Sequence, residues 1–383
     1  MLHSPIAFSA VTPTPMASLQ KPLENRVDNI ISRMTLEEKI GQLFIVAADG
    51  NLESIIRTYH PGGFILFSRH TPTILQTMQL TDELRQSAQI PVFIAIDQEG
   101  GRVSRLPFAV TVPDARRLGT LPEAALQNVG SLVGQELHAL GFNINFAPVL
   151  DVDTRAENPV IGNRSFSQDP YTVARLGSAY IRGLSLAGIA AAAKHFPGHG
   201  DTSSDSHLVL PVVEQSEDRL QTVELLPFRA ALRAGVDLIM MAHVSYPSLD
   251  PTPNWPASLS HPIVTDLLRN ELEYSGIIIT DAMNMKAITG LKDPGQTAKV
   301  AFNAGVDIIL MPEDLPTAYL SILSAVQSGE IPLSRLNASL RRILALKLRL
   351  PQDRTQSFSA RLKYALDTVG SNEHRLKLQQ FLE

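Results

Sequence analysis

The sequence predicts a (β/α)8 barrel of the TIM type, a single domain of the α/β class. Eight short apolar runs alternate with helix-like segments over about 300 residues, a length that suits such a barrel. The runs are nearly continuous, which is typical of parallel strands covered on both faces. They are Leu43–Ala47, Phe64–Phe67, Val92–Ile96, Asn143–Pro148, Ile189–Ala193, Asp237–Ala242, Gly276–Thr280 and Asp307–Met311. An open doubly wound sheet is the alternative, but Gly62-Gly63 stands alone where a dinucleotide fold needs a longer glycine pattern.

Segments between the runs carry helix start and stop signals. Thr35-Leu36-Glu37-Glu38 has the pattern of a capping box. Asp169-Pro170 offers an N-cap followed by a proline in the first turn, and that helix is predicted to stop at Gly188. Ser334–Leu350 is a basic amphipathic helix with leucines on one side, which we expect to pack on the barrel exterior; membrane binding is the alternative.

The composition is that of an ordinary globular protein. The chain has 383 residues, a net charge of -5, 44% hydrophobic residues and no cysteine. This charge balance gives no reason to expect nucleic acid as a partner, and the lack of cysteine excludes disulfides and thiolate metal sites. No run approaches the roughly 20 apolar residues that span a bilayer, so a membrane partner is not expected either.

Three segments are expected along the chain. Residues 1–24 are predicted to form a loosely ordered lead, residues 25–350 the barrel, and residues 351–383 a helical tail. Prolines interrupt the apolar residues of the first 20 positions, so they lack the continuous core of a secretory signal. A cytoplasmic location is therefore expected.

Acidic and basic side chains follow several of the predicted strands directly. In a (β/α)8 barrel the active site lies at the C-terminal ends of the strands, so residues from separate strands converge on one rim. The segments in question are Asp97–Arg105 after the third run, Asp151, Asp153 and Asn163–Phe166 after the fourth, Lys194 and His195 after the fifth, His243 after the sixth, Thr280–Met285 after the seventh, and Glu313 and Asp314 after the eighth.

The segment Lys194–His207 is the densest of these groups. Within fourteen residues it holds one Lys, three His, two Asp, two Gly and one Pro. It follows the apolar run Ile189–Ala193 without a break. A buried strand that leads into polar, turn-forming sequence is typical of a catalytic loop on a rigid scaffold.

These segments resemble the single-domain bacterial β-N-acetylglucosaminidases of glycoside hydrolase family 3. Lys194–Thr202, followed by Asp205-Ser206-His207 and closed by Leu210-Pro211, matches the long signature of that family. Three further blocks occur in the family's order, from about Thr35 to about Leu348 overall. They are Asp97–Arg105, Asn163–Phe166 and Thr280–Met285. One departure is Ala282, where many bacterial members have a second Asp.

The resemblance implies retaining removal of terminal β-linked N-acetylglucosamine from cell-wall or chitin-type fragments, without cofactor or metal. Asp281 is the implied nucleophile, and a carboxylate at the end of a buried strand is held rigidly enough for that role. His207, held by Asp205, is the implied acid/base, and an imidazole titrates near neutrality. Asp97, Arg105, Arg164, Lys194 and His195 are implied to bind the sugar. Structural ion pairs, a helix N-cap at Asp281 and a solvated surface His207 are the alternatives.

Other functions were weighed on the same residues. His195, His199 and His207 with Asp201 and Asp205 have the spacing of a metal site, but a metal-dependent barrel hydrolase would place a His-x-His pair after its first strand, and Leu43–Gly50 contains no His. The β-glucosidases and β-xylosidases of the family usually carry a second domain that supplies the acid/base. A non-catalytic sugar-binding protein and a phosphorylase side activity also stay open. The natural aglycone and the oligomeric state do not follow from the sequence.

Overall fold

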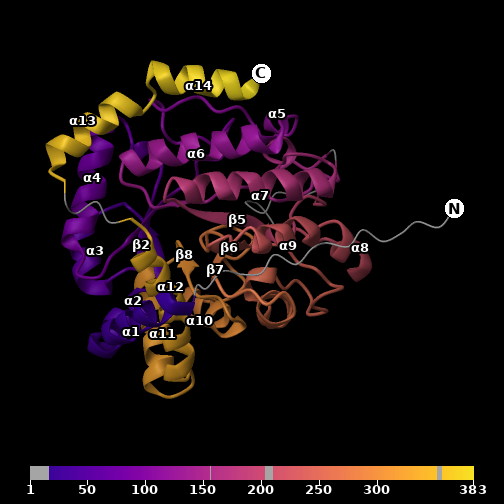
Figure 1. Ribbon diagram of the computed structural model, residues 1–383. Helices are drawn as coiled ribbons and strands as arrows, with labels where there is room; N and C mark the ends of the chain where they lie inside the picture. Colours follow the sequence, from indigo (N-terminus) through magenta and orange to yellow (C-terminus); the bar gives the residue numbers. More distant parts are fainter. Residues whose placement is uncertain (1–16, 156, 203–209, 352–355) are drawn as a thin grey trace.

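The computed structural model describes residues 17–155, 157–202, 210–351 and 356–383 (Figure 1). Eight strands form one parallel sheet in the order β7-β6-β5-β4-β3-β2-β1-β8. A parallel bridge between Ile279 and Ile308 joins the two ends of this order. The predicted (β/α)8 barrel is therefore confirmed. The strands are β1 (Phe44–Ala47), β2 (Gly63–Leu66), β3 (Phe93–Ile96), β4 (Ile144–Asn145), β5 (Ala190–Phe196), β6 (Leu238–Met241), β7 (Ile277–Thr280) and β8 (Ile309–Leu310).

Each predicted run overlaps one of these strands, and the fifth strand extends three residues beyond its predicted run. Strand β5 continues through Lys194 and His195 to Phe196, and all seven of its residues are buried. The sequence analysis placed Lys194 and His195 after the strand, which is wrong. Both are strand residues, so the barrel itself holds their backbones.

Helices surround the barrel (Figure 1). They are α1 (Ala17–Arg33), α2 (Leu36–Gly41), α3 (Leu52–Tyr59), α4 (Ile74–Ser87), α5 (Ala115–Leu118), α6 (Glu123–Ala139), α7 (Pro170–Leu186), α8 (Glu217–Thr222), α9 (Leu225–Arg233), α10 (Pro294–Ala304), α11 (Leu315–Gln327), α12 (Leu333–Arg349), α13 (Phe358–Thr368) and α14 (Asn372–Leu382), with shorter turns η1 (Ser68–His70), η2 (Gly162–Arg164) and η3 (Ala257–Leu259), and the π-helix η4 (Pro262–Glu271).

The predicted helix starts are confirmed. At α2 the Glu38 amide donates to Thr35 Oγ1 at 3.2 Å, and the Thr35 amide donates to Glu38 Oε2 at 2.8 Å, which completes the capping box. At α7 the Thr172 amide donates to Asp169 Oδ2 at 2.8 Å. That helix ends at Leu186, two residues before the predicted stop at Gly188.

The amphipathic helix over residues 334–350 corresponds to α12, which packs on the barrel exterior as predicted. Its apolar side is buried through Leu336, Leu340, Ile343 and Leu344. Helix α1 packs against it. Helix α1 begins at Ala17, so residues 17–24 of the predicted lead are helical. Residues 1–16 lie outside the described part of the chain.

The tail consists of α13 and α14, which are docked on the barrel beside α4 and α6 (Figure 1). Arg361 of α13 forms a bidentate ion pair with Asp82 of α4, at 2.6 and 2.7 Å. The buried Glu136 of α6 accepts hydrogen bonds from the Gly370 amide at 2.8 Å and from His374 Nδ1 at 3.0 Å. Within the described ranges, no helix has the length and apolarity that a membrane span requires.

Candidate active site

A cavity of about 300 Å³ lies at the C-terminal ends of the strands. Six of the eight residues that the sequence analysis assigned to the site line it: Asp97, Arg105, Arg164, Lys194, His195 and Asp281. The other two, Asp205 and His207, lie outside the described residues. A larger cavity of about 450 Å³ borders Pro91, Val92 and Asn143, at the opposite ends of the strands. Because active sites of this fold lie at the C-terminal ends, we take the smaller cavity as the site.

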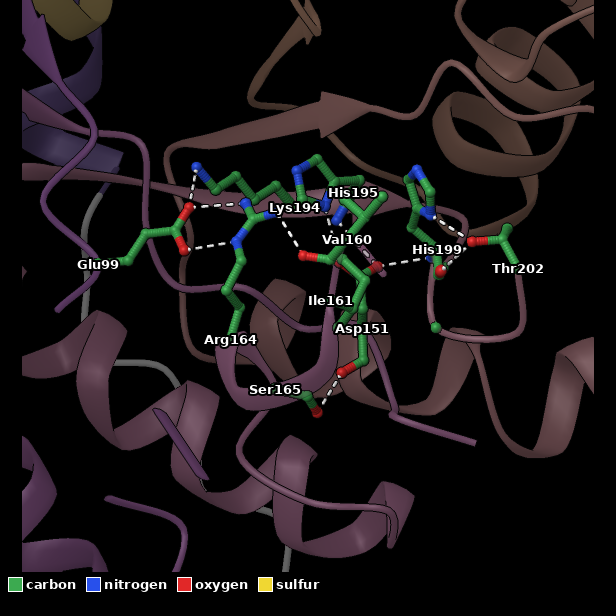
Figure 2. Close-up of polar contacts among 12 residues, drawn as sticks. Glu99, Asp151, Val160, Ile161, Arg164, Ser165, Lys194, His195, His199 and Thr202 are labelled. Atoms are coloured by element: carbon green, nitrogen blue, oxygen red, sulfur yellow. Dashed lines mark hydrogen bonds and ion pairs between the residues drawn. The ribbon is translucent and has the colours of Figure 1, made fainter. Parts of the chain in front are cut away.

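Glu99 joins the two principal cations of the cavity (Figure 2). Lys194 Nζ lies 2.6 Å from Glu99 Oε1 and 2.7 Å from Asp97 Oδ1. Arg164 binds Glu99 with both Nε and Nη2, at 2.9 and 2.8 Å. Burial raises the pKa of Glu99, but the charges of Arg164 and Lys194 outweigh burial and hold that pKa far below its usual range. Glu99 is therefore ionised, and it fixes both cations in place.

Sequence reasoning missed this role of Glu99. Arg102, the cation nearest to Glu99 in the sequence, donates to the Val160 carbonyl. Arg164 reaches Glu99 from the loop after β4 and makes two hydrogen bonds to its carboxylate. A backbone carbonyl could not offer Arg164 such a two-point contact. The signal was present in the sequence, since Glu99 stands two residues after Asp97 at the end of a strand.

Asp151 organises the end of β5 (Figure 2). Its Oδ2 lies 2.7 Å from His195 Nδ1, and its Oδ1 accepts from the backbone amides of His195 at 3.1 Å and of His199 at 2.6 Å. Burial raises the pKa of Asp151, but the adjacent His195 and His199 outweigh burial and the pKa is lowered. An ionised Asp151 makes His195 Nδ1 the donor, so Nε2 is the ring nitrogen left for the cavity.

The turn after β5 is closed by hydrogen bonds and close packing. Asn158 Nδ2 donates to the carbonyls of His199 at 2.9 Å and of Gly200 at 3.0 Å. A Cβ on Gly200 would lie 1.7 Å from the Val152 carbonyl oxygen, so only glycine fits there. His199 Nδ1 lies 3.0 Å from Thr202 Oγ1, and burial, with the charge of His195, lowers the pKa of His199 to about 4. His199 is thus neutral near pH 7.

Asp281 follows β7 directly. Its backbone amide donates to the Met241 carbonyl at 3.1 Å, and its Oδ1 accepts from the Ala282 amide at 2.7 Å. Burial raises the pKa of Asp281, but electrostatic interactions with the neighbouring His195 and His243 and the hydrogen bond from the Ala282 amide outweigh burial and lower that pKa. The site therefore holds an ionised carboxylate on a rigid strand end, as a nucleophile requires.

Arg105 is placed differently from Lys194 and Arg164. Its amide donates to Gln98 Oε1 at 2.8 Å, and its guanidinium carbon lies 5.9 Å from the centre of the Phe67 ring. Its Nε is buried and has no hydrogen-bond partner among the described residues. A buried donor of this kind is costly unless a ligand or water supplies an acceptor.

Three of the five residues with metal-site spacing, His195, His199 and Asp201, lie within the described residues. Among the described residues, no group of three or more His, Asp or Glu side chains is arranged to hold a metal ion. Two members of the proposed ligand set, Asp205 and His207, lie outside those residues.

Comparison with known proteins decides the family. The family model for the glycosyl hydrolase family 3 N-terminal domain matches residues 35–346. The chain belongs to glycosyl hydrolase family 3. This family assignment agrees with the barrel, and it covers each strand from β1 to β8.

Individual family 3 proteins resemble the chain along most of its length. It is 39% identical to Beta-hexosaminidase A of Pseudoalteromonas piscicida over 85% of this chain, but it spans only 58% of that protein. It is 36% identical to Beta-hexosaminidase of Pseudomonas aeruginosa PAO1, over 78% of this chain and 88% of the relative. A solved family 3 β-N-acetylglucosaminidase from Paenibacillus sp. FPU-7 superposes with a TM-score of 0.83 at 39% identity, over 91% of this chain and 68% of that one.

Proposed function

We propose that the chain is a retaining β-N-acetylhexosaminidase that removes terminal, non-reducing β-linked N-acetylglucosamine. The observation that carries the proposal is the position of Asp281, an ionised carboxylate that lines the same cavity as the pair Lys194–Asp97. The names of the relatives support the sugar class. Cell-wall or chitin-type fragments are the natural substrates we propose.

The proposed reaction has two displacements. In the first, a carboxylate oxygen of Asp281 forms a bond to the anomeric carbon while the glycosidic bond breaks, and the departing oxygen takes a proton from His207. In the second, water attacks the anomeric carbon, the ester to Asp281 breaks, and His207 recovers a proton from the water. Asp205 orients the imidazole and stabilises its charged form.

The remaining polar residues are proposed to hold the sugar. Asp97 has one oxygen bound to Lys194, and no described residue makes a hydrogen bond to the other, which suits a sugar hydroxyl. Lys194, Arg164 and Arg105 supply donors, and His195 presents Nε2. The Glu99 carboxylate keeps the guanidinium of Arg164 in place while the sugar binds.

The substrate class is tested on a panel of aryl glycosides. The N-acetyl-β-glucosaminide should be hydrolysed far faster than the β-glucoside and the β-xyloside. A reversed ratio would identify the chain as a β-glucosidase or β-xylosidase instead. Product analysis in phosphate buffer separates hydrolysis from phosphorolysis, because only the latter yields a sugar 1-phosphate.

The residue assignments are tested separately. Asp281→Asn should lower kcat by about 1,000-fold or more. Mass spectrometry after a slow fluorosugar substrate should place the adduct on Asp281, and an adduct on Asp97 contradicts the assignment. His207→Ala should slow substrates with poor leaving groups by about 100-fold but activated aryl substrates far less, because only the former need a proton. Equal losses contradict the acid/base role.

A further inference from the structure

His243 lies beside the nucleophile without lining the cavity. It follows β6 and is 1% exposed. Its Nε2 lies 3.1 Å from the carbonyl oxygen of Ala282, the residue after Asp281. Its Nδ1 lies 2.8 Å from Ser258 Oγ. Because Ser258 belongs to η3, the imidazole connects η3 with the segment that carries the nucleophile.

The protonation of the ring follows from these two partners. A carbonyl oxygen only accepts, so Nε2 carries the hydrogen and donates to Ala282. Burial lowers the pKa of His243 and outweighs the charge of Asp281, which raises that pKa. The ring is therefore neutral near pH 7. Nδ1 is then an acceptor, and the Ser258 hydroxyl donates to it. The Ser258 hydroxyl thus satisfies the tautomer that donates to Ala282.

Ser258 is itself held by the end of β6. Its amide donates to the Ala242 carbonyl at 3.2 Å, and the Ala257 amide donates to the Val244 carbonyl at 2.8 Å. Ser258 is fully buried. The imidazole is thus anchored to the barrel on the side away from the nucleophile.

Ala282 connects His243 to the nucleophile through two hydrogen bonds of its backbone. Its carbonyl accepts from His243, and its own amide donates to Asp281 Oδ1 at 2.7 Å. No described residue makes a hydrogen bond to Asp281 Oδ2. When Ala282 is held in place, its amide binds Oδ1 of Asp281, and Oδ2 is left for bond formation.

We propose that His243 is a positioning residue, which acts through Ala282 to orient the Asp281 carboxylate so that Oδ2 attacks the anomeric carbon. The inference rests on the proposed function of Asp281. It assigns a role in the reaction to a histidine that does not touch the substrate. A misplacement of about 1 Å at a reacting atom can cost about 100-fold in rate, so the hydrogen bond to Ala282 is expected to be kinetically visible.

Two substitutions separate this hydrogen bond from packing. His243→Phe keeps a ring in the buried space but removes the donor. His243→Gln loses the ring but keeps an amide that can donate to the Ala282 carbonyl. The measured quantity is the rate at which a slow fluorosugar substrate labels Asp281, followed by mass spectrometry, together with the melting temperature and the inhibition constant of N-acetylglucosamine.

We expect His243→Phe to lower the labelling rate by about 100-fold, with an unchanged inhibition constant, and His243→Gln to recover at least about 10-fold of that loss. If the Phe variant labels as fast as the wild type, or the Gln variant is no faster than the Phe variant, the positioning role is wrong. A wild type that is labelled elsewhere than Asp281 overturns the proposed function instead, so the two failures are distinguishable.

A milder variant covers the case in which His243→Phe does not fold. Ser258→Ala removes only the hydroxyl that donates to Nδ1 and holds the ring, and it should lower the labelling rate by about 10-fold. Ser178→Ala is the matched control, since Ser178 is also buried and donates to the Ala174 carbonyl within α7, away from the site. Equal labelling rates in the two serine variants contradict the inference.

Discussion

Lys194 and Glu99 form a buried ion pair in the cavity, with Nζ and Oε1 2.6 Å apart. The side chain of Lys194 is only 3% exposed, and that of Glu99 only 7%. Asp97 and Arg164 complete the group, so two carboxylates balance two cations. A buried charge without its partner is unstable, so each member of this group depends on the others.

Glu99→Gln is expected to weaken both folding and sugar binding. It removes the charge that compensates Lys194 and Arg164, which should cost about 3 kcal/mol or more of the free energy of unfolding. Because the pKa of Glu99 is lowered by folding, its stabilisation is complete above the unfolded-state pKa and is lost as the pH falls. Urea unfolding at pH 7 and at pH 4 should show the larger loss at pH 7.

The control for this prediction is Glu123→Gln. Glu123 pairs with Arg182 on the surface, with both side chains more than 40% exposed. Its substitution should change the free energy of unfolding by about 0.5 kcal/mol or less. Equal losses in the two variants would show that Glu99 has no special role.

The barrel followed from the sequence because apolar runs and strand ends are local features. Asp97 and Asp281 directly follow β3 and β7, and Lys194 lies in the C-terminal half of β5, so the fold alone brings these residues together. Glu99 and Asp151 were not assigned because their role is defined by partners distant in the chain, Arg164 for one and His195 for the other. Spacing along the chain carries no information on which of several cations a carboxylate meets.

Asp151→Asn is expected to impair catalysis more than folding. An amide in place of the carboxylate weakens the hold on His195 Nδ1 and the His199 amide, and it permits the wrong ring tautomer. By analogy with other orienting carboxylates, kcat/KM should fall by about 100-fold. The measurement is hydrolysis of an aryl N-acetyl-β-glucosaminide.

Asp153→Asn is the matched control for Asp151. Asp153 stands two residues later and pairs with Arg116, and it makes no hydrogen bond to His195. Its substitution should leave kcat/KM within about 3-fold of the wild type. A comparable loss of activity in both variants would mean that the loop as a whole, and not Asp151, is responsible.

Removal of metal ions is expected to leave activity unchanged. Two of the three carboxylates that line the cavity, Asp97 and Glu99, already pair with Lys194 and Arg164, so they are poorly placed to bind a metal cation. Prolonged dialysis against a chelator, followed by assay in metal-free buffer, measures this. Activity that is lost and then restored by zinc would favour the metal-dependent hydrolase over the glycosidase mechanism.

Glu224→Gln is expected to stabilise the protein in a pH-dependent manner. Glu224 is 1% exposed and packs against Gly198, and its Oε2 has no hydrogen-bond partner among the described residues. Burial raises the pKa of Glu224 to about 7, and Arg219, 3.4 Å away, offsets this only partly. The protonated form thus contributes stability below the unfolded-state pKa of about 4.5, and this contribution is lost as the pH rises through about 7.

Glutamine mimics the protonated carboxyl at every pH, so the variant should match the wild type at pH 4. At pH 8 its melting temperature should be higher by about 2 °C or more. Glu217→Gln is the control, because Glu217 is exposed in the first turn of α8 and should shift the melting temperature by about 1 °C or less at both values. A Glu224→Gln variant that is less stable than the wild type at pH 8 would show that the ionised carboxylate is needed beneath Gly198.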